Sequence, residues 1–298
     1  MKVTHLPDVE QRPRRVAVGT FDGVHLGHRE VISGADTVLT FDPHPQSVVA
    51  PGSEPRLLTT IERKTELIAS LGVEELVIIP FDGAFAARSA QDFVDHVLVE
   101  MLQATHVSIG ENFRFGHKAQ GDCDLLAGDA RFETRVVPLL EHDGEVVSSS
   151  HIRGLVLAGA VQEADRLLGE PFQVRGEVVH GDKRGRTLGY PTANLVPDTR
   201  FVTPGHGVYA CRATLGPGGP DAEVALAAAV NVGVRPQFVT GRGELIEAYL
   251  LDFSGDIYGR QLRIDFLDRL RGERRFDSVD ALVEQMGRDV ARAREIAA

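Results

Sequence analysis

The chain has few cysteines and a negative net charge, and each of these two features excludes a class of protein. Its 298 residues include two cysteines, Cys123 and Cys211, and no tryptophan. Two distant cysteines are too few for a disulfide-rich secreted domain or a thiolate zinc site, so free thiols in a reducing cytoplasm are the simpler interpretation. The net charge of −11 argues against a nucleic-acid binder, because affinity for phosphate backbones comes from clustered Lys and Arg.

The sequence also lacks the long apolar runs of a membrane protein. No run approaches the roughly 20 apolar residues that cross a bilayer. The polar segment 1–15 has no apolar core, so it is not a signal peptide. Hydrophobic residues make up 43% and charged residues 25%, the mix of a globular protein. We therefore expect a cytoplasmic protein without membrane contact, long enough for two domains.

Apolar strands alternate with helices in the first half of the chain. Strands are expected at 16–19, 37–41, 76–79 and 106–110. Thr59-Thr-Ile-Glu62 has capping-box spacing and opens a helix, as does Ser89-Ala-Gln-Asp92. This alternation predicts a Rossmann-like parallel sheet with helices on both faces, and ligands of such sheets lie at the carboxyl ends of strands.

The pattern changes to period-two alternation after Pro171. Two short helices, 150–158 and 161–168, close the first half. Alternating runs follow at 173–179, 207–213, 245–251 and 262–266. They predict a small antiparallel β-barrel, and a helix at about 278–296 ends the chain. We expect an α/β domain over 1–169 and a barrel domain over 170–298.

A glycine-rich loop with two histidines follows the first strand: Gly19-Thr-Phe-Asp-Gly-Val-His25-Leu-Gly-His28. Its glycines let backbone amides approach an anion, and the helix N-terminus adds a favourable dipole. Two ring N–H donors around a glycine can reach one phosphate group, which suits nucleotidyl transfer. A pre-placed donor of this kind commonly lowers the barrier by about 3–4 kcal/mol.

Two further segments are ambiguous by themselves. Ser148-Ser-Ser-His-Ile-Arg153 begins a helix, where one serine can serve as the N-cap. Hydroxyls with an arginine one turn inside the helix also suit phosphate recognition. Asn112, in the segment 110–116, could be only a turn residue.

His25-Leu-Gly-His28 is similar to the signature of the nucleotidyltransferase superfamily. Together with Thr40-Phe-Asp-Pro-His-Pro, Glu111-Asn-Phe-Arg-Phe-Gly and Ser148-Ser-Ser-His-Ile-Arg, it resembles the FMN adenylyltransferase module of bacterial bifunctional riboflavin kinase/FAD synthetases. The resemblance implies that His25 and His28 contact ATP phosphates and that the FMN phosphate attacks the α-phosphorus directly. The residues it implies at the ATP phosphates are Gly19, Phe21, Asp22, Gly23, Asn112, Ser149, Ser150 and Arg153.

The sequence departs from this family at two places. Only Arg29 to Asp36 separates His28 from the second strand, where the family has a full helix and loop. The family also tends to read Ser-Ser-Thr at 148–150, a change that keeps the hydroxyl. The shortened helix leaves a second hypothesis open: a riboflavin kinase whose degenerate N-terminal domain binds nucleotide but transfers it poorly or not at all.

A second glycine-rich segment opens the second domain: Val179-His-Gly-Asp-Lys-Arg-Gly185, whose amides could wrap phosphates. Thr192 and Asn194 follow, alternate along a strand, and each offer an oxygen to Mg²⁺; the alternative is a turn leading into a strand. Glu247 lies in the middle of an apolar strand. A buried carboxylate needs a partner or a purpose unless it faces solvent on an edge strand.

These segments resemble the riboflavin kinase module of the same bifunctional family, as do 204–209, 231–236, 250–253 and 270–276. The resemblance implies that Thr192 and Asn194 hold Mg²⁺–ATP, and that Glu247 takes the proton of the ribityl 5′-hydroxyl. It places Gly181, Lys183 and Gly185 at the ATP phosphates, and Arg271, Glu273 and Phe276 over the flavin. Gln237 and Tyr249 replace the family's usual Thr and His at positions without a catalytic role.

The two resemblances together imply an enzyme of FAD biosynthesis. It would phosphorylate riboflavin with ATP to give FMN, then adenylylate FMN to FAD and release pyrophosphate, with Mg²⁺ as cofactor. Riboflavin, FMN and ATP are the expected partners, with no nucleic acid or membrane; the oligomeric state is not predicted. A non-catalytic flavin or nucleotide sensor is a third reading. It would predict the loss of His25, His28, Asn194 or Glu247, and all four are present.

Overall fold

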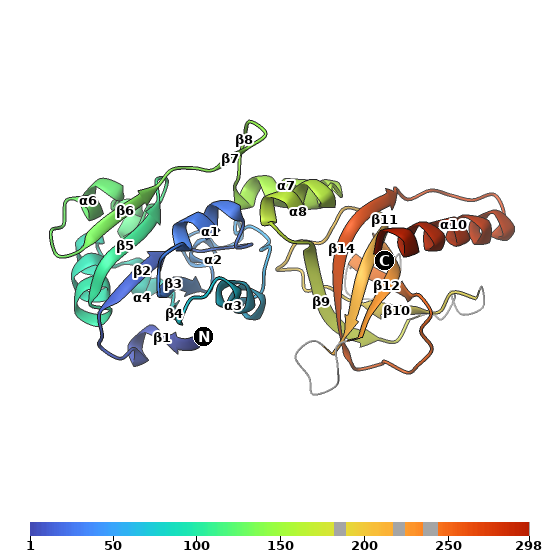
Figure 1. Cartoon of the computed structure of the whole chain (residues 1–298), viewed down its shortest axis with the longest axis horizontal. Coiled ribbons are helices and arrows are strands. Elements are labelled where there is room, and N and C mark those ends of the chain that lie inside the picture. Colours follow the sequence, from blue (N-terminus) through green and yellow to red (C-terminus); the bar gives the residue numbers. More distant parts are fainter. Residues whose placement is uncertain (182–188, 217–223, 235–243, 298) are drawn as a thin grey trace. The chain divides into compact units, whose positions relative to one another are not determined.

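The computed structural model describes residues 1–181, 189–216, 224–234 and 244–297. The chain divides into two compact units, Met1–His151 and Ile152–Ala298 (Figure 1).

The first unit is built on a six-stranded parallel sheet with the order β1-β4-β3-β2-β5-β6. The strands are β1 Lys2–His5, β2 Arg14–Val18, β3 Thr37–Asp42, β4 Glu75–Pro80, β5 Ala104–Gly110 and β6 Glu133–Val137. The strand order reverses between β2 and β5, and ligands of open α/β sheets bind in the crevice outside such a switch point. The loops after these two strands are those that hold His25 and Asn112.

Helices and short hairpin strands complete this unit. They are η1 Leu6–Asp8, α1 Leu26–Ile32, α2 Pro45–Val49, α3 Ile61–Ser70, α4 Gly83–Ala86, α5 Ala90–Asp92, the π-helix η2 Phe93–Met101, η3 His117–Ala119, α6 Cys123–Ala127, β7 Glu141–His142 and β8 Glu145–Val146. Both faces of the sheet are buried: Val16 and Leu39 belong to one apolar core, and Ala17 and Val38 to another. Alternate residues of each strand therefore enter different cores, as a covered parallel sheet requires.

The predicted elements of this unit are confirmed, with one correction at α3. Its N-cap is Thr60, whose side chain accepts from the backbone N–H of Arg63, and not Thr59. Thr59 instead turns its hydroxyl toward the loop after β2. The spacing to Glu62 had favoured the wrong threonine, because capping statistics do not include a tertiary partner.

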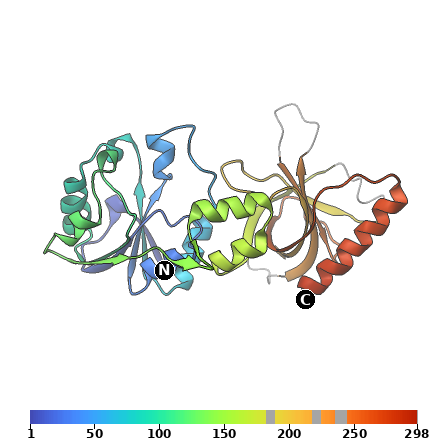
Figure 2. The ribbon, with the colours of Figure 1, turned by 90° about the horizontal axis from the view of Figure 1, so that it is seen from above.

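The second unit contains a closed six-stranded antiparallel barrel in the order β10-β13-β12-β11-β14-β9. Its strands are β9 Phe172–Val179, β10 Thr192–Leu195, β11 Gly207–Leu215, β12 Val224–Val234, β13 Glu244–Leu250 and β14 Gln261–Arg271. The last helix, α10 Val279–Ala297, packs along β11, β12 and β14 (Figure 2). The predicted barrel and C-terminal helix are both confirmed.

Two helices precede the barrel: α7 Ser149–Ala158 and α8 Val161–Leu168. The division into compact units falls within α7, earlier in the chain than the expected boundary between 169 and 170. Helix α8 packs against β9 and β14. A fragment that begins at 170 would therefore leave apolar surface of the barrel uncovered.

Candidate active sites

The loop after β2 has an unusual backbone conformation. Phe21 and Val24 have φ angles of 48° and 43°, and Gly23 has 87°. Left-handed backbone is uncommon for bulky side chains and persists where the surroundings enforce it. Both bulky side chains are fully buried. Their apolar burial offsets the local strain and fixes the path of the chain toward His25.

Side chains from distant segments hold this loop. The buried Asp22 carboxylate accepts from the backbone N–H groups of Leu58, at 2.9 Å, and Thr59, at 3.2 Å. In return the Gly23 N–H donates to Thr59 Oγ1 at 3.1 Å. Ser149 Oγ donates to the Asp22 carbonyl at 2.9 Å. The fold thus brings together two predicted phosphate residues, Asp22 and Ser149, and both make contacts that shape the loop.

Lys64 supports the same loop from α3. Its Nζ donates to the Thr20 carbonyl at 2.7 Å, and Thr40 Oγ1 donates to the same oxygen at 3.2 Å. Burial lowers the pKa of Lys64, although the nearby carboxylates of Asp22 and Asp42 oppose this shift. Sequence reasoning missed this residue. The signal was a lysine in the apolar stripe of α3, one turn before buried Leu67 and Ile68.

The two histidines stack on one another at the start of α1. Their ring centroids are 3.6 Å apart, with planes 17° from parallel. His25 is the N-cap, and its Nδ1 accepts from the His28 backbone N–H at 3.3 Å. An accepting Nδ1 carries no proton, so a neutral His25 ring has its proton on Nε2. The two imidazole rings therefore lie face to face at the start of α1.

His28 is held in its neutral form. Burial lowers its pKa well below the ordinary value, and the nearby His25 and Lys64 lower it further. The rings of His28 and Phe21 form a T-shaped pair, with centroids 5.3 Å apart. Its Nδ1 is buried and has no hydrogen-bond partner within the described part of the chain. A neutral imidazole with an unpartnered nitrogen is suited to hydrogen bonding with a ligand.

The short helix α1 has seven residues, and other segments complete its last turn. Ser108 Oγ of β5 donates to the Val31 carbonyl at 2.7 Å, and Arg135 Nη1 of β6 donates to the Ser33 carbonyl at 2.8 Å. Carbonyls at a helix end need such partners. The family resemblance leads us to expect further helical turns after α1. In their place, side chains of β5 and β6 donate to the carbonyls at the end of this helix.

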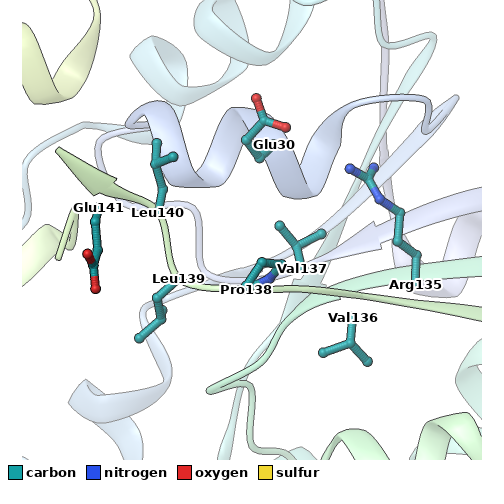
Figure 3. A pocket seen from close by; sticks show the side chains of 8 residues that line it. All are labelled: Glu30, Arg135, Val136, Val137, Pro138, Leu139, Leu140 and Glu141. Atoms are coloured by element: carbon teal, nitrogen blue, oxygen red, sulfur yellow. The ribbon is translucent and has the colours of Figure 1, made fainter.

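A cavity of ≈ 450 Å³ lies beside this helix (Figure 3). It is lined by Glu30, Arg135, Val136, Val137, Pro138, Leu139, Leu140 and Glu141. Figure 3 shows Glu30 on the helix and the others along the strand and segment that pass it. A methyl group added at Gly27 would lie 3.7 Å from Leu140 Cβ and 3.4 Å from the His25 ring. The cavity therefore borders the histidine pair.

The remaining predicted residues of this site are more dispersed. Asn112 is exposed in the turn after β5, at the other side of the switch point. Ser150 is exposed in the first turn of α7. Arg153 lies one turn further on, in the second compact unit, so its action on the triphosphate stays a prediction.

Three polar side chains form a row across the barrel. Asn194 of β10 pairs in register with Glu247 of β13, which pairs with Asn231 of β12. Directly paired residues of antiparallel strands share a face. Asn231 Nδ2 donates to Glu247 Oε2 at 3.4 Å. Asn231 lies in a segment that carried the resemblance, but sequence reasoning gave it no role.

The oxygen of Asn194 is suited to a cation. Its Nδ2 donates to the Thr192 carbonyl at 3.3 Å, while Oδ1 is buried and lacks a hydrogen-bond partner among the residues described. Gly181 lies against this amide: a methyl group there would be 2.7 Å from Oδ1. The described ranges hold no cluster of three His, Cys, Asp or Glu side chains that could cage a metal. Magnesium often relies on few protein oxygens beside substrate phosphates, so these residues fit it.

Two predicted phosphate residues, Lys183 and Gly185, lie outside the described residues, as does Gln237. The predicted flavin segment is described. The guanidinium carbons of Arg271 and Arg274 lie 5.6 and 4.5 Å from the centre of the Phe276 ring.

Two family models match the chain. Residues 8–151 match the model described as FAD synthetase, and residues 168–297 match riboflavin kinase. The bifunctional riboflavin kinase/FMN adenylyltransferase of Bacillus subtilis (strain 168) is 37% identical over 96% of this chain and 93% of that relative. The protein of the same description from Escherichia coli (strain K12) is 37% identical over 98% and 96%.

A solved structure from Streptococcus pneumoniae, described as a macrolide-efflux protein, superposes with a TM-score of 0.87. It is 32% identical and covers 99% of both chains. The efflux activity in that description is a statement about that protein alone. Across the described parts of our chain, no helix combines the length and apolar character that a membrane span requires.

Proposed function

We propose that this chain, which belongs to the bifunctional riboflavin kinase/FMN adenylyltransferase family, performs its two reactions at two separate sites. It phosphorylates riboflavin to FMN and adenylylates FMN to FAD. We assign adenylylation to the loop after β2 in the first unit, and phosphorylation to the polar row of the barrel.

In adenylylation, a phosphate oxygen of FMN attacks the α-phosphorus of ATP, and the bond to the departing pyrophosphate breaks. Negative charge grows on the oxygens around this phosphorus. His25 offers its Nε2–H as a fixed donor, and neutral His28 offers a second ring. Donors that are in place before charge develops cost no reorganisation during the reaction. The observation that carries this assignment is the stacked pair on a loop that distant side chains hold.

The cavity beside α1 is the proposed place of the adenosine of ATP. Its volume of ≈ 450 Å³ lies in the usual range of small-molecule sites, and valine, proline and leucine side chains make much of its lining. Leu140, which lines the cavity, lies next to Gly27 between the two histidines. A nucleoside in the cavity would therefore have its phosphates near His25 and His28. Asn112, across the switch point, is then on the side of the incoming FMN.

In phosphorylation, Glu247 accepts the proton of the ribityl 5′-hydroxyl as that oxygen attacks the γ-phosphorus of ATP. Asn231 holds one oxygen of the carboxylate. Thr192 and Asn194 would hold Mg²⁺, which when bound neutralises phosphate charge. The unpartnered Oδ1 of Asn194, in the same row as Glu247, carries this assignment.

Segment 271–276, including Glu273 and Phe276, covers the flavin of the kinase site. The catalytic halves separate near 169–170, although α8 packs with the barrel. The enzyme works in the cytoplasm, where Cys123 and Cys211 stay free thiols.

One incubation tests the proposal as a whole. Purified protein is mixed with riboflavin, ATP and Mg²⁺, and FMN and FAD are separated over time. FMN should rise first and FAD should follow, and a chelator of Mg²⁺ should stop FMN formation. FMN that accumulates without FAD at saturating ATP would favour the kinase-only hypothesis.

A further inference from the structure

An ion pair fastens the end of β14 to the C-terminal helix α10. Arg271, the last residue of β14, donates from Nε and Nη2 to Oδ2 of Asp289, at 3.0 and 2.8 Å. Gln285 Nε2 donates to Oδ1 of the same carboxylate at 2.7 Å. The Asp289 side chain is 7% exposed. Burial of a carboxylate costs free energy, because the charge loses its hydration. These charge-assisted hydrogen bonds compensate that cost.

The remaining nitrogen of Arg271 is also engaged within the protein. Nη1 donates to the carbonyl of Gly272 at 3.2 Å. Its guanidinium also lies over the face of Phe276, where a cation is attracted to the ring. All three guanidinium nitrogens therefore contact protein atoms. This arrangement suits a residue that holds the following segment rather than one that binds the flavin itself.

Segment 272–276 extends from this ion pair toward the kinase base. A methyl group added at Gly233 would lie 2.8 Å from Oε1 of Glu273 and 3.6 Å from Nδ2 of Asn231. Asn231 is the residue that donates to Glu247. The segment therefore has one end fixed by Arg271 and its Glu273 side chain against the strand beside the base.

We propose that Arg271 and Asp289 are a positioning pair that sets segment 272–276 over the riboflavin site. This inference rests on the proposed function, which assigns the segment to the flavin. The ion pair closes a loop between the end of β14 and α10, and closure reduces the conformations open to the residues between. The C-terminal helix, through Asp289, thereby contributes to riboflavin binding without touching the flavin.

The test uses the full-length enzyme with Asp289→Asn, which keeps the side-chain shape and removes the charge. Asp289→Glu keeps the carboxylate. The matched control is Asp252→Asn: Asp252 also pairs with an arginine of α10, Arg294, at 3.0 Å, but its side chain is 70% exposed. Its φ of 57° is one that asparagine tolerates. Each variant is measured for the KM of riboflavin, the KM of ATP, kcat and the thermal midpoint.

Asp289→Asn should raise the KM of riboflavin by about tenfold or more, because small misplacements of positioning groups are costly. The KM of ATP should change by less than about twofold, since ATP binds at the other side of the row. Asp289→Glu should recover part of the lost affinity, and Asp252→Asn should match the wild type. Adenylylation of supplied FMN should be unchanged in all three.

An unchanged KM of riboflavin in Asp289→Asn would overturn the inference. So would an equal rise of both KM values with a lower thermal midpoint, because that is the signature of a purely structural pair. Phe276→Ala separates this failure from that of the proposed function. If Phe276→Ala raises the KM of riboflavin while Asp289→Asn does not, the positioning pair alone is wrong. If Phe276→Ala has no effect, the assignment of the segment to the flavin is wrong, and the inference falls with it.

Discussion

The proposed adenylyltransferase site and the proposed kinase site are built by different means. The loop after β2 takes its shape from contacts with residues far along the chain, such as Asp22 with Leu58 and Lys64 with Thr20. The polar row of the barrel takes its shape from strand register, which places Asn194, Glu247 and Asn231 side by side. The first site therefore depends on distant supports, and the second depends mainly on the sheet.

This difference predicts which substitutions should reduce activity at each site. Removing a support from the first site should damage adenylylation even though no reacting group has changed. The second site has its reacting groups on hydrogen-bonded strands, so its most sensitive positions should be the polar residues themselves. Each prediction below tests one side of this comparison.

The largest effect is expected from the double change His25→Ala and His28→Ala. Loss of both donors should lower adenylylation of FMN by at least about 10³-fold. Riboflavin phosphorylation by the same protein is the internal control and should be unchanged. Both products are measured by separation of the flavins. FAD formation above a tenth of the wild-type rate would show that the pair is not the phosphate site.

Glu247→Gln should produce the reverse pattern. The amide keeps the shape and cannot accept the proton, so FMN formation should fall by about 10²–10⁴-fold. Adenylylation of supplied FMN should continue at the wild-type rate. Phosphorylation of riboflavin at a near wild-type rate would remove Glu247 from the role of base.

Lys64→Met tests whether a support can matter as much as a reacting group. The variant loses the hydrogen bond to Thr20 and the positive charge beneath the loop, so adenylylation should fall by about 10–100-fold. Arg63→Met is the matched control, since Arg63 pairs with Glu66 on the same helix and is not buried. Kinase activity should survive in both. Equal adenylylation rates in the two variants would contradict a role for Lys64.

A smaller effect is expected in the pH dependence of stability, which should differ between the two units. Burial raises the pKa of Asp165 in α8 to about 7, and the nearby Asp265 adds to this shift. The folded state then binds a proton that the unfolded state has released, so stability falls as pH rises from about 4 to 7. Asp165→Asn keeps an oxygen for the Phe172 N–H and removes the carboxylate. It should raise the free energy of unfolding at pH 8 by on the order of 2–4 kcal/mol, measured by denaturant titration.

The first unit should respond to acid in the opposite sense. Burial alone would raise the pKa of Glu75, but hydrogen bonds from Thr4 and Arg14 outweigh it and lower the pKa. This contribution to stability is complete above the ordinary carboxyl pKa and is lost as pH falls through the lowered one. If acid raises the free energy of unfolding of the first unit, the assignment of Glu75 is wrong. If Asp165→Asn leaves the pH dependence of stability unchanged, the assignment of Asp165 is wrong.

The sequence predicts the fold well and the supports of the sites poorly. Period-two alternation identified the barrel strands β9, β11, β13 and β14, and Asn194 and Glu247 could be placed on strands because strand periodicity is local. Strand β12 was not predicted. Strand β1 and the hydrogen bonds to Asp22 were not predicted, because they join segments whose separation in sequence carries no periodic signal. The same reason hid the contacts of Ser108 and Arg135 with the last turn of α1. Lys64 left a signal, a charged residue in an apolar stripe, but its partner is a backbone carbonyl that composition cannot show.

The most direct test of two independent sites is a complementation experiment. The Glu247→Gln protein and the His25→Ala, His28→Ala protein are each incubated with riboflavin, ATP and Mg²⁺, separately and then mixed. Alone, the first should leave riboflavin nearly unconverted, and the second should accumulate FMN without FAD. The mixture should make FAD, because FMN released by one protein is adenylylated by the other. A mixture that makes no FAD, although the Glu247→Gln protein adenylylates supplied FMN, would contradict sites that work independently.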